Sequence, residues 1–280
     1  MTHQLRPPRE VLDYYDSFPE ELRLQQGPFR LEFERTKEIL ARVLPPAPAV
    51  VVDVGGAAGA YSFWLADIGY TVHLIDSSTR LVSEALRRDA GASRRIASAT
   101  IGDARALPQP DASADAVLVM GPLYHLTQEE DRMSALGEAL RVVKTGGIVA
   151  VAAISRYASA LDGLVRRLAL DPAFKQIRDR DLIDGQHRND PDTGEYFTTA
   201  FLHRPEDLVA EMHRAGFVAV SVRGVEGPGW MLQDFDARWE DEALRADLLD
   251  VARKLECEPS IVGASAHLIG IGRKPAHRMA

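Results

Sequence analysis

Apolar and polar positions follow two periods along most of this chain. Short runs of apolar, often β-branched residues have the length of buried strands. Between them lie stretches whose apolar residues recur with the spacing of one helix face. The strand-like runs are 50–54, 71–76, 96–101, 116–120, 148–154, 217–225 and 267–272. This alternation predicts an α/β fold with a largely parallel sheet that carries helices on both faces.

The alternation is interrupted in three places, and these interruptions define the predicted domain organisation. Residues 1–48 contain short helical patterns before a Pro-rich linker, so we expect an N-terminal helical lid there. Residues 49–280 form the predicted main domain, with excursions at about 156–203 and 226–265, the second holding one amphipathic helix at about 236–255. Open α/β sheets bind ligands at the carboxyl ends of their strands, so we expect the lid and the excursions to cover that edge.

The first strand-like run leads into a turn of small residues and then into a helical pattern. The turn spans residues 55–59 and reads Gly-Gly-Ala-Ala-Gly. Small residues allow the backbone to approach a ligand closely, and the free N–H groups at a helix start attract negative or polar groups. The turn departs from the Gly-x-Gly-x-x-Gly spacing of dinucleotide-binding folds. It is preceded by an acid, Asp53, which would repel a pyrophosphate and attract an ammonium group.

This stretch resembles the first motif of the class I S-adenosylmethionine-dependent methyltransferases, which reads acid-x-Gly-x-Gly-x-Gly. Ala57 stands where the middle glycine of the motif is expected. The resemblance is to bacterial small-molecule methyltransferases and implies a doubly wound, Rossmann-like sheet of seven strands, mostly parallel with an antiparallel last strand. It also implies S-adenosylmethionine as the cofactor, S-adenosylhomocysteine as the product, and Asp53 near the cofactor's amino group. The residues that it places along the methionine and ribose end are Gly55, Gly56, Ala57 and Gly59.

Two further acids follow the next two strands. Asp76 ends the second strand-like run, where a carboxylate can accept hydrogen bonds from both hydroxyls of a ribose. Asp103 follows the third run, where the family resembled here places an acid against adenine. Each acid could instead be an ordinary polar residue at a strand end or turn, but their agreement with Asp53 favours cofactor binding. The other residues predicted at the cofactor site are Ser77, Ala104, Met120 and Gly121.

The segment 121–126, Gly-Pro-Leu-Tyr-His-Leu, follows the fourth strand and is similar to a segment of some bacterial small-molecule methyltransferases. Within it, His125 is the first candidate for a general base, with a pKa near its ordinary value. His187 in the first excursion is the second candidate. A histidine that only packs or orders the loop explains His125 equally well. The residues predicted to bind the acceptor are Tyr15, Tyr124, Arg156, Tyr196 and Trp230.

Composition narrows the range of partners. The chain has 280 residues and a net charge of −8, which disfavours nonspecific binding to nucleic acid. No apolar run approaches the roughly 20 residues of a membrane span, and the amino-terminal residues lack the features of a signal peptide. The single cysteine, Cys257, excludes an internal disulfide, and no pattern of histidine and cysteine indicates a metal site. We therefore expect a cytoplasmic protein with a small-molecule acceptor, no metal, and no nucleic-acid or membrane partner.

These observations predict methyl transfer from S-adenosylmethionine to an oxygen or nitrogen atom of a small-molecule acceptor by in-line displacement. The protein would contribute mainly alignment and the exclusion of water. One alternative is an NAD(P)-dependent oxidoreductase on a Rossmann-like fold, which the acid before the turn and the missing dinucleotide spacing argue against. The other is a non-catalytic S-adenosylmethionine-binding protein, which Ala57 keeps open.

Overall fold

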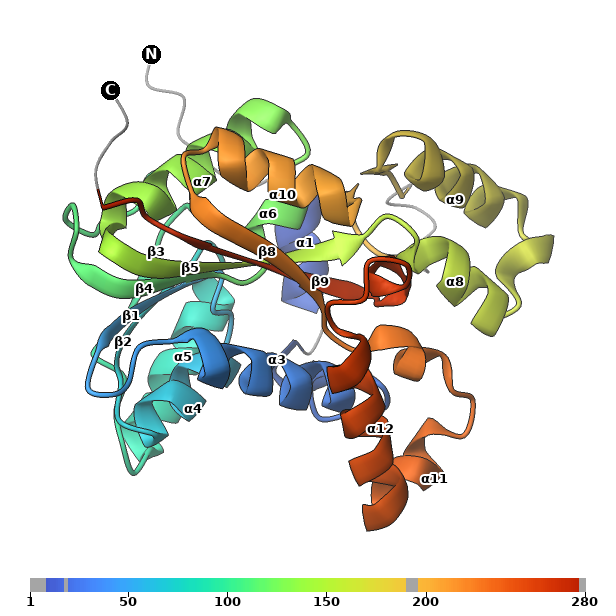
Figure 1. The fold of residues 1–280 in the computed structure, drawn as a ribbon, viewed down its shortest axis with the longest axis horizontal. Coiled ribbons are helices and arrows are strands. Elements are labelled where there is room, and N and C mark those ends of the chain that lie inside the picture. Colours follow the sequence, from blue (N-terminus) through green and yellow to red (C-terminus); the bar gives the residue numbers. More distant parts are fainter. Residues whose placement is uncertain (1–8, 18–19, 190–195, 277–280) are drawn as a thin grey trace.

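The computed structural model describes residues 9–17, 20–189 and 196–276. Within these residues, nine strands form the sheet at the centre of the molecule (Figure 1). In chain order the strands are β1 (Val50–Val54), β2 (Thr71–Asp76), β3 (Ser98–Ile101), β4 (Ala114–Val119), β5 (Val143–Ser155), β6 (Gln186–His187), β7 (Ala200–His203), β8 (Val218–Gly224) and β9 (His267–Arg273).

Seven of these strands lie in the order β3-β2-β1-β4-β5-β9-β8. Strands β1 to β5 pair in parallel, whereas β9 runs antiparallel to both β5 and β8. This confirms the predicted Rossmann-like sheet with an antiparallel last strand. The short strands β6 and β7 are additional. They bring the first excursion back to the sheet, because β7 pairs with the last residues of β5 beyond the end of β4.

Helices cover both faces of the sheet (Figure 1). The helices are α1 (Arg9–Ser17), α2 (Glu20–Arg23), α3 (Phe29–Val43), α4 (Ala60–Asp67), α5 (Thr79–Gly91), α6 (Pro122–His125), α7 (Glu129–Val142), α8 (Ala158–Val165), α9 (Pro172–Asp184), α10 (Pro205–Arg214), α11 (Phe235–Glu240) and α12 (Glu242–Leu255), with short 3₁₀ turns η1 (Leu168–Leu170), η2 (Gly227–Met231) and η3 (Val262–Ala264). Helices α6, α7 and α10 pack on one face, and α3, α4 and α5 on the other. In the described part of the chain, every helix is too short or too polar to cross a bilayer.

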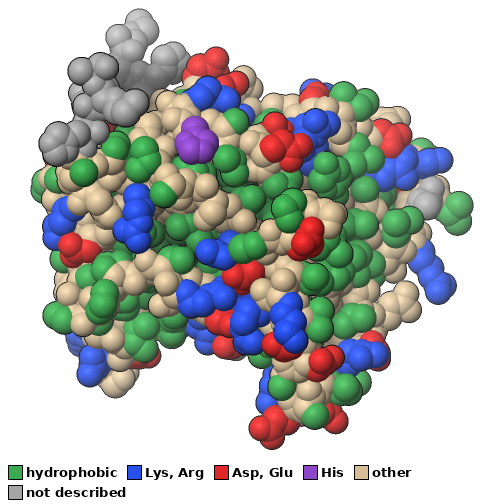
Figure 2. Space-filling view, viewed as in Figure 1, with side chains coloured by type: hydrophobic (Ala, Val, Ile, Leu, Met, Phe, Trp, Pro, Cys, Tyr) green, Lys and Arg blue, Asp and Glu red, His purple; other side chains and the backbone are tan. Residues whose placement is uncertain are grey.

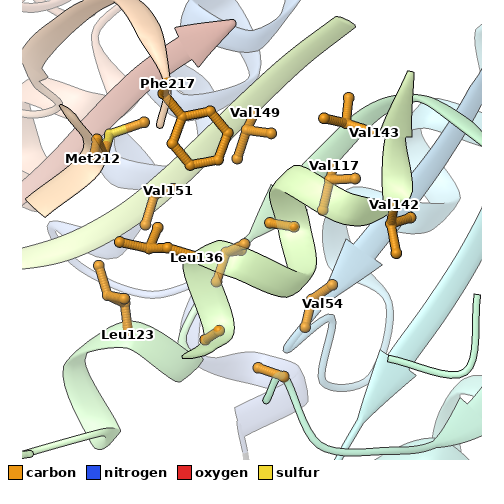
Figure 3. Packing of buried hydrophobic residues seen from close by; sticks show 14 of the residues in the cluster. Val54, Val117, Leu123, Leu136, Val142, Val143, Val149, Val151, Met212 and Phe217 are labelled. Carbon is orange, nitrogen blue, oxygen red and sulfur yellow. The ribbon is translucent and has the colours of Figure 1, made fainter. Parts of the chain in front are cut away.

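The central strands are almost continuously apolar because both faces of the sheet are buried. Successive residues of a strand point to opposite faces. Val52 and Val54 of β1 therefore pack in the core beneath α6 and α7, while Val51 packs with α3 and α4. Figure 3 shows the first of these cores, where Leu136 of α7 lies among strand valines and near Phe217. Each such side chain contributes roughly 2 kcal/mol by burial, so this two-sided core holds the strand ends in place.

The second excursion differs from the prediction. The single helix expected at about 236–255 is two helices, α11 and α12, which meet at Asp241. Their apolar residues Trp239 and Leu248 pack against Leu31 at the start of α3. The excursion therefore braces the N-terminal segment, and Figure 1 shows α11 and α12 projecting below α3. Residues 1–8 of the predicted N-terminal lid lie outside the described residues.

Candidate active site

A cavity opens at the carboxyl ends of β1, β2 and β4, which is where an open α/β sheet binds its ligand. Helices α1 and α2 contribute to its wall through Val11, Leu12, Tyr15, Glu20 and Arg23. The N-terminal helices, which are one part of the predicted lid, therefore reach the site. No described residue of either excursion lines this cavity, so their role as a lid stays a prediction.

The small-residue turn after β1 forms one wall of the cavity. Gly55 and Gly59 have φ angles of +76° and +86°, which favour glycine. A Cβ atom at Gly55 would lie 2.3 Å from Cδ of Pro122, so the backbone there packs against the loop after β4. Ala57 also has a positive φ, +48°. An L-residue in this conformation costs roughly 1 kcal/mol, and this is the structural consequence of the alanine in the motif.

Asp53 lies beneath the turn and has no exposed surface. Its Oδ2 accepts a hydrogen bond from Oγ of Ser62 at 2.6 Å, while its Oδ1 is buried without a protein partner. Burial raises the pKa of Asp53 to about 6. Gly56 allows the turn to pack this closely on Asp53, because a Cβ atom at Gly56 would lie 2.9 Å from Oδ2 of Asp53. A buried carboxylate oxygen without a partner is suited to an ammonium group, directly or through a water molecule.

Asp76, at the end of β2, ties the turn to the neighbouring strand. Its carboxylate oxygens accept hydrogen bonds from the backbone N–H groups of Ala57 and Ser78, each at 2.8 Å. Burial raises the pKa of Asp76 in spite of these hydrogen bonds. The residue lines the cavity together with Ser77. Each carboxylate oxygen can accept more than one hydrogen bond, so Asp76 retains the capacity to bind a diol.

Asp103 and Ala104 follow β3 and also line the cavity. Asp103 is bound by the guanidinium of Arg105, with Nε at 2.9 Å and Nη2 at 2.8 Å from its carboxylate oxygens. Burial disfavours the charged form of Asp103, but the hydrogen bonds from Arg105 outweigh it and hold the pKa of Asp103 below its ordinary value. Sequence analysis missed Arg105, although a basic residue two positions after an acid is a local signal. The pair fixes a charged acceptor at the cavity edge.

His125 lies at the other end of the cavity, after Met120 and Gly121. Its Nδ1 is 3.3 Å from the carbonyl oxygen of Thr199, and its Nε2 is 2.9 Å from the hydroxyl of Tyr15. A carbonyl only accepts, so Nδ1 carries the proton and Nε2 accepts from Tyr15. Burial lowers the pKa of His125 to about 4. The expectation of an ordinary pKa was therefore wrong, and His125 is a neutral and weak base.

Aromatic rings surround His125. Tyr15 and Tyr124 make edge-on contacts with its ring at centroid distances of 5.3 and 4.8 Å. Phe197, from the end of the first excursion, lies 5.7 Å from the same ring and 5.5 Å from the ring of Tyr14. Tyr15, Tyr124 and His125 all line the cavity. This end of the cavity is therefore suited to a flat aromatic molecule.

His187, the second candidate base, does not line the cavity. Its Nδ1 is 2.8 Å from Oδ2 of Asp181, and its Nε2 is 3.1 Å from the carbonyl oxygen of Phe197. Both ring nitrogens are thus used within the fold, where they connect α9 to the segment that contacts His125. His187 therefore has a structural role in this fold, and its role as a second base stays a prediction.

Three of the residues predicted to bind the acceptor also lie outside the cavity lining. Arg156 is buried, and its Nε donates to the carbonyl oxygen of Leu202 at 3.1 Å. Tyr196 packs on Phe174, at a centroid distance of 5.3 Å, in a small separate core. Trp230 donates from its indole nitrogen to the carbonyl oxygen of Ala264 at 2.9 Å. Each of these side chains holds an excursion against the fold, and their contact with an acceptor stays a prediction.

Two charged residues of α2, Glu20 and Arg23, line the cavity and were missed in the sequence analysis. Nε of Arg23 is 2.8 Å from Oε1 of Glu20, a pair spaced three residues apart on one helix. The Glu-x-x-Arg pattern is a local signal for such a pair. Its position over the strand ends depends on how the N-terminal segment folds back, which local patterns do not show.

Comparison with known proteins agrees with this geometry. Residues 52–151 match a family model described as a methyltransferase domain. A demethylmenaquinone methyltransferase from Beutenbergia cavernae is 30% identical over 183 residues, which make up 63% of this chain and 69% of that protein. A ubiquinone/menaquinone biosynthesis C-methyltransferase from Caulobacter vibrioides is 30% identical over 120 residues, or 39% of this chain and 45% of that protein.

A solved structure shows the same fold. A phosphoethanolamine N-methyltransferase from Haemonchus contortus, in complex with S-adenosylhomocysteine, superposes with a TM-score of 0.55 and 16% identity over 86% of this chain and 52% of that chain. The sheet order and the acid and small-residue turn after β1 thus define a methyltransferase fold. The chain belongs to the class I S-adenosylmethionine-dependent methyltransferases. It is an enzyme that uses S-adenosylmethionine, which rules out the oxidoreductase and the non-catalytic alternatives.

Proposed function

We propose that this enzyme methylates a small aromatic acceptor that carries a hydroxyl group, at a ring carbon beside that hydroxyl. This proposal rests on the aromatic lining at one end of the cavity, where the Tyr15 hydroxyl is hydrogen-bonded to the neutral ring of His125. The relatives named for quinone biosynthesis support an aromatic acceptor and carbon as the methylated atom.

Within this proposal, the strand ends hold the cofactor. The unpartnered Oδ1 of Asp53 fits the ammonium group, Asp76 fits the ribose diol, and Asp103 fits the adenine amino group. When bound, S-adenosylmethionine supplies an electrophilic methyl group on its sulfonium. The remaining residues proposed to contact it, through backbone or small side chains, are Gly55, Gly56, Ala57, Gly59, Ser77, Ala104, Met120 and Gly121.

The hydroxyls beside His125 form a directed chain. Because Thr199 fixes the proton on Nδ1, Tyr15 donates to Nε2 of His125. Tyr124 lines the cavity together with Tyr15. In the proposed chain its hydroxyl donates to the Tyr15 oxygen and leaves its own oxygen as an acceptor. An acceptor hydroxyl in the cavity would donate to this oxygen. Since His125 is a weak base, the chain orients that hydroxyl and draws on its proton as the new bond forms, rather than ionising it beforehand.

Oxygen of the same hydroxyl is the second candidate for the methylated atom. A phenol that loses its proton shares the negative charge between oxygen and the neighbouring ring carbons. The proposed chain from Tyr124 through Tyr15 to His125 would face the hydroxyl itself, which favours oxygen. At carbon, the ring loses its proton when the carbon–methyl bond replaces the methyl–sulfur bond. At oxygen, the hydroxyl proton is the one lost.

The test uses two naphthalenes whose oxygens carry either dissociable protons or methyl groups. Purified enzyme with S-adenosylmethionine should methylate 1,4-dihydroxynaphthalene and leave 1,4-dimethoxynaphthalene unchanged. The release of S-adenosylhomocysteine measures turnover, and NMR of the product distinguishes a new C–CH₃ group from a new O–CH₃ group. We expect Tyr15→Phe to lower kcat by roughly 10- to 100-fold, with little change in cofactor affinity. Turnover restricted to amine acceptors, or equal turnover by Tyr15→Phe, would contradict the proposal.

A further inference from the structure

The methionine end of S-adenosylmethionine carries a carboxylate as well as an ammonium group, and no residue assigned above pairs with the carboxylate. Asp53 suits the ammonium group and would repel the carboxylate. Among the described residues that line the cavity, the arginines are Arg23 on α2 and Arg88 on α5. The histidine there, His125, is neutral because burial lowers its pKa to about 4. One of the two arginines is therefore the candidate partner.

Arg88 is held by the turn and by α4. Its Nη1 donates to the carbonyl oxygen of Ala58 at 2.7 Å, and its Cζ lies 4.8 Å from the ring centroid of Phe63. Arg23 of α2 lines the same cavity as Tyr124. Burial raises the pKa of Tyr124, and the nearby charge of Arg23 opposes that rise. The Tyr124 hydroxyl in turn lies 3.5 Å from the position of a Cβ on Gly121. Arg23 therefore faces the ends of β1 and β4, where the methionine end of the cofactor is proposed to lie.

The two glutamates on Arg23 are held differently. Nη1 and Nη2 of Arg23 donate to both carboxylate oxygens of Glu32, at 2.6 and 3.1 Å. Glu32 is also 3.7 Å from Nδ1 of His267, which is bonded to Glu226 at 2.5 Å, so Glu32 is anchored to β9 and the second excursion. Glu20 binds only the Nε edge of the guanidinium, through one oxygen at 2.8 Å, and itself lines the cavity.

We propose that Arg23 binds the carboxylate of the cofactor's methionine moiety, and that Glu20 occupies the place of this carboxylate until the cofactor enters. Glu32 keeps Arg23 in position throughout. The Nε edge of a guanidinium can bind a carboxylate in a bidentate manner, whereas Glu20 uses one oxygen there. The carboxylate of the cofactor replaces that of Glu20 at the guanidinium, so Arg23 keeps the same number of negatively charged partners. The exchange makes the position of α2 respond to the cofactor.

The test compares S-adenosylmethionine with its decarboxylated form, which keeps the sulfonium and the amine and lacks only the carboxylate. Calorimetric titration of the wild type should show tighter binding of S-adenosylmethionine. We expect Arg23→Gln to weaken S-adenosylmethionine roughly 10- to 100-fold and to change the decarboxylated form less than about threefold. Glu20→Gln removes the competing charge and should tighten S-adenosylmethionine severalfold without affecting the decarboxylated form.

Arg88→Gln is the matched control, because Arg88 lines the same cavity. It should alter both ligands to the same extent. Arg23→Lys keeps the positive charge beside Glu32 but loses the bidentate guanidinium, so the variant should fold normally. Its affinity for S-adenosylmethionine should fall by an intermediate amount, and its affinity for the decarboxylated form should not change. Equal weakening of both ligands by Arg23→Gln and Arg23→Lys, weaker S-adenosylmethionine binding by Glu20→Gln, or discrimination lost in Arg88→Gln would each overturn the proposal. No acceptor is present, so the result is independent of the acceptor proposed above.

Discussion

At the scale of single residues, the buried carboxylate of Asp53 suits cofactor binding but destabilises the fold. A carboxylate with no exposed surface and one oxygen without a partner destabilises the fold whenever it is charged. Burial raises the pKa of Asp53 to about 6, whereas an unfolded chain ionises aspartate near pH 4. The folded state therefore binds more protons than the unfolded state between about pH 4 and pH 6. In this window the contribution of Asp53 to stability falls as the pH rises.

We expect Asp53→Asn to remove this pH dependence. The amide keeps the shape of the side chain and can still bond to Ser62, so the free energy of unfolding at pH 7 should rise by about 2 to 3 kcal/mol relative to the wild type. Urea denaturation without cofactor, at several pH values between 4 and 8, measures the difference. S-adenosylmethionine should bind at least about tenfold more weakly, since the ammonium group loses its charged partner.

Asp67→Asn provides the control for this prediction, because Asp67 is exposed at the end of α4. It should leave both the pH dependence and the affinity unchanged. If Asp53→Asn were less stable than the wild type at pH 7, Oδ1 of Asp53 would have a stabilising partner and its charge would not oppose folding.

At the scale of elements, the break between α11 and α12 is a feature that helical periodicity in the sequence did not predict. Asp241 ends α11 and caps α12, and its Oδ1 accepts hydrogen bonds from the N–H groups of Ala243 and Leu244 at 2.9 and 3.0 Å. An aspartate within an amphipathic pattern is compatible with a continuous helix, so the sequence predicted one. The N-cap conformation is decided by the packing of Trp239 and Leu248 on either side of it against Leu31.

Asp241→Ala should lower the free energy of unfolding by about 1 kcal/mol, the usual effect of removing an N-cap. Because this excursion does not line the cavity, the affinity for S-adenosylmethionine should not change. Thermal unfolding and calorimetric titration measure the two quantities. Asp247→Ala, which removes an exposed acid within the same helix, should change stability by less than about 0.5 kcal/mol. Similar losses in the two variants would show that Asp241 does not act as a cap.

At the scale of the whole molecule, a charge cluster around the buried residues Arg35 and Glu256 joins the N-terminal and C-terminal parts of the chain. Arg35 of α3 has no exposed surface and pairs with Glu256 just after α12. Arg42 and Arg223 bind the same glutamate at 2.6 and 2.9 Å. Figure 2 shows basic and acidic side chains gathered over this part of the surface, where α3 meets α12. Three arginines on one carboxylate make Glu256 the centre of the contact between α3 and the second excursion.

Glu256→Gln should destabilise the protein by about 2 to 3 kcal/mol, because it leaves Arg35 buried with only part of its compensation. Urea denaturation at pH 7 measures the change, and 0.5 M salt should reduce it little, since a buried pair is weakly screened. The more exposed pair of Glu34 with Lys37 on the same helix, both half-buried, offers the comparison. Glu34→Gln should cost less than about 0.5 kcal/mol. An equally small effect of Glu256→Gln would mean that the cluster contributes little to the contact.

The sequence alone determined the sheet and the strand ends of this protein. Strand β1 and the turn after it, and the acids Asp76 and Asp103, are recognisable because each signal is contained in a few consecutive residues. Parallel strands then bring their carboxyl ends to one edge, so Asp53, Asp76 and Asp103 had to gather there. Local pattern and sheet geometry together were enough to predict the fold and the expected location of the cofactor site.

The tertiary structure alone decided the other half of the site. Tyr15 and His125 are 110 residues apart in the chain yet share a hydrogen bond, and the low pKa of His125 follows from the burial that this packing creates. Whether Trp230 faces a ligand or a backbone carbonyl, and whether Arg23 reaches the cavity, likewise depends on how distant segments close over the sheet. Periodicity records which face of an element is apolar. It does not record which other element covers that face, because many partners bury apolar area equally well.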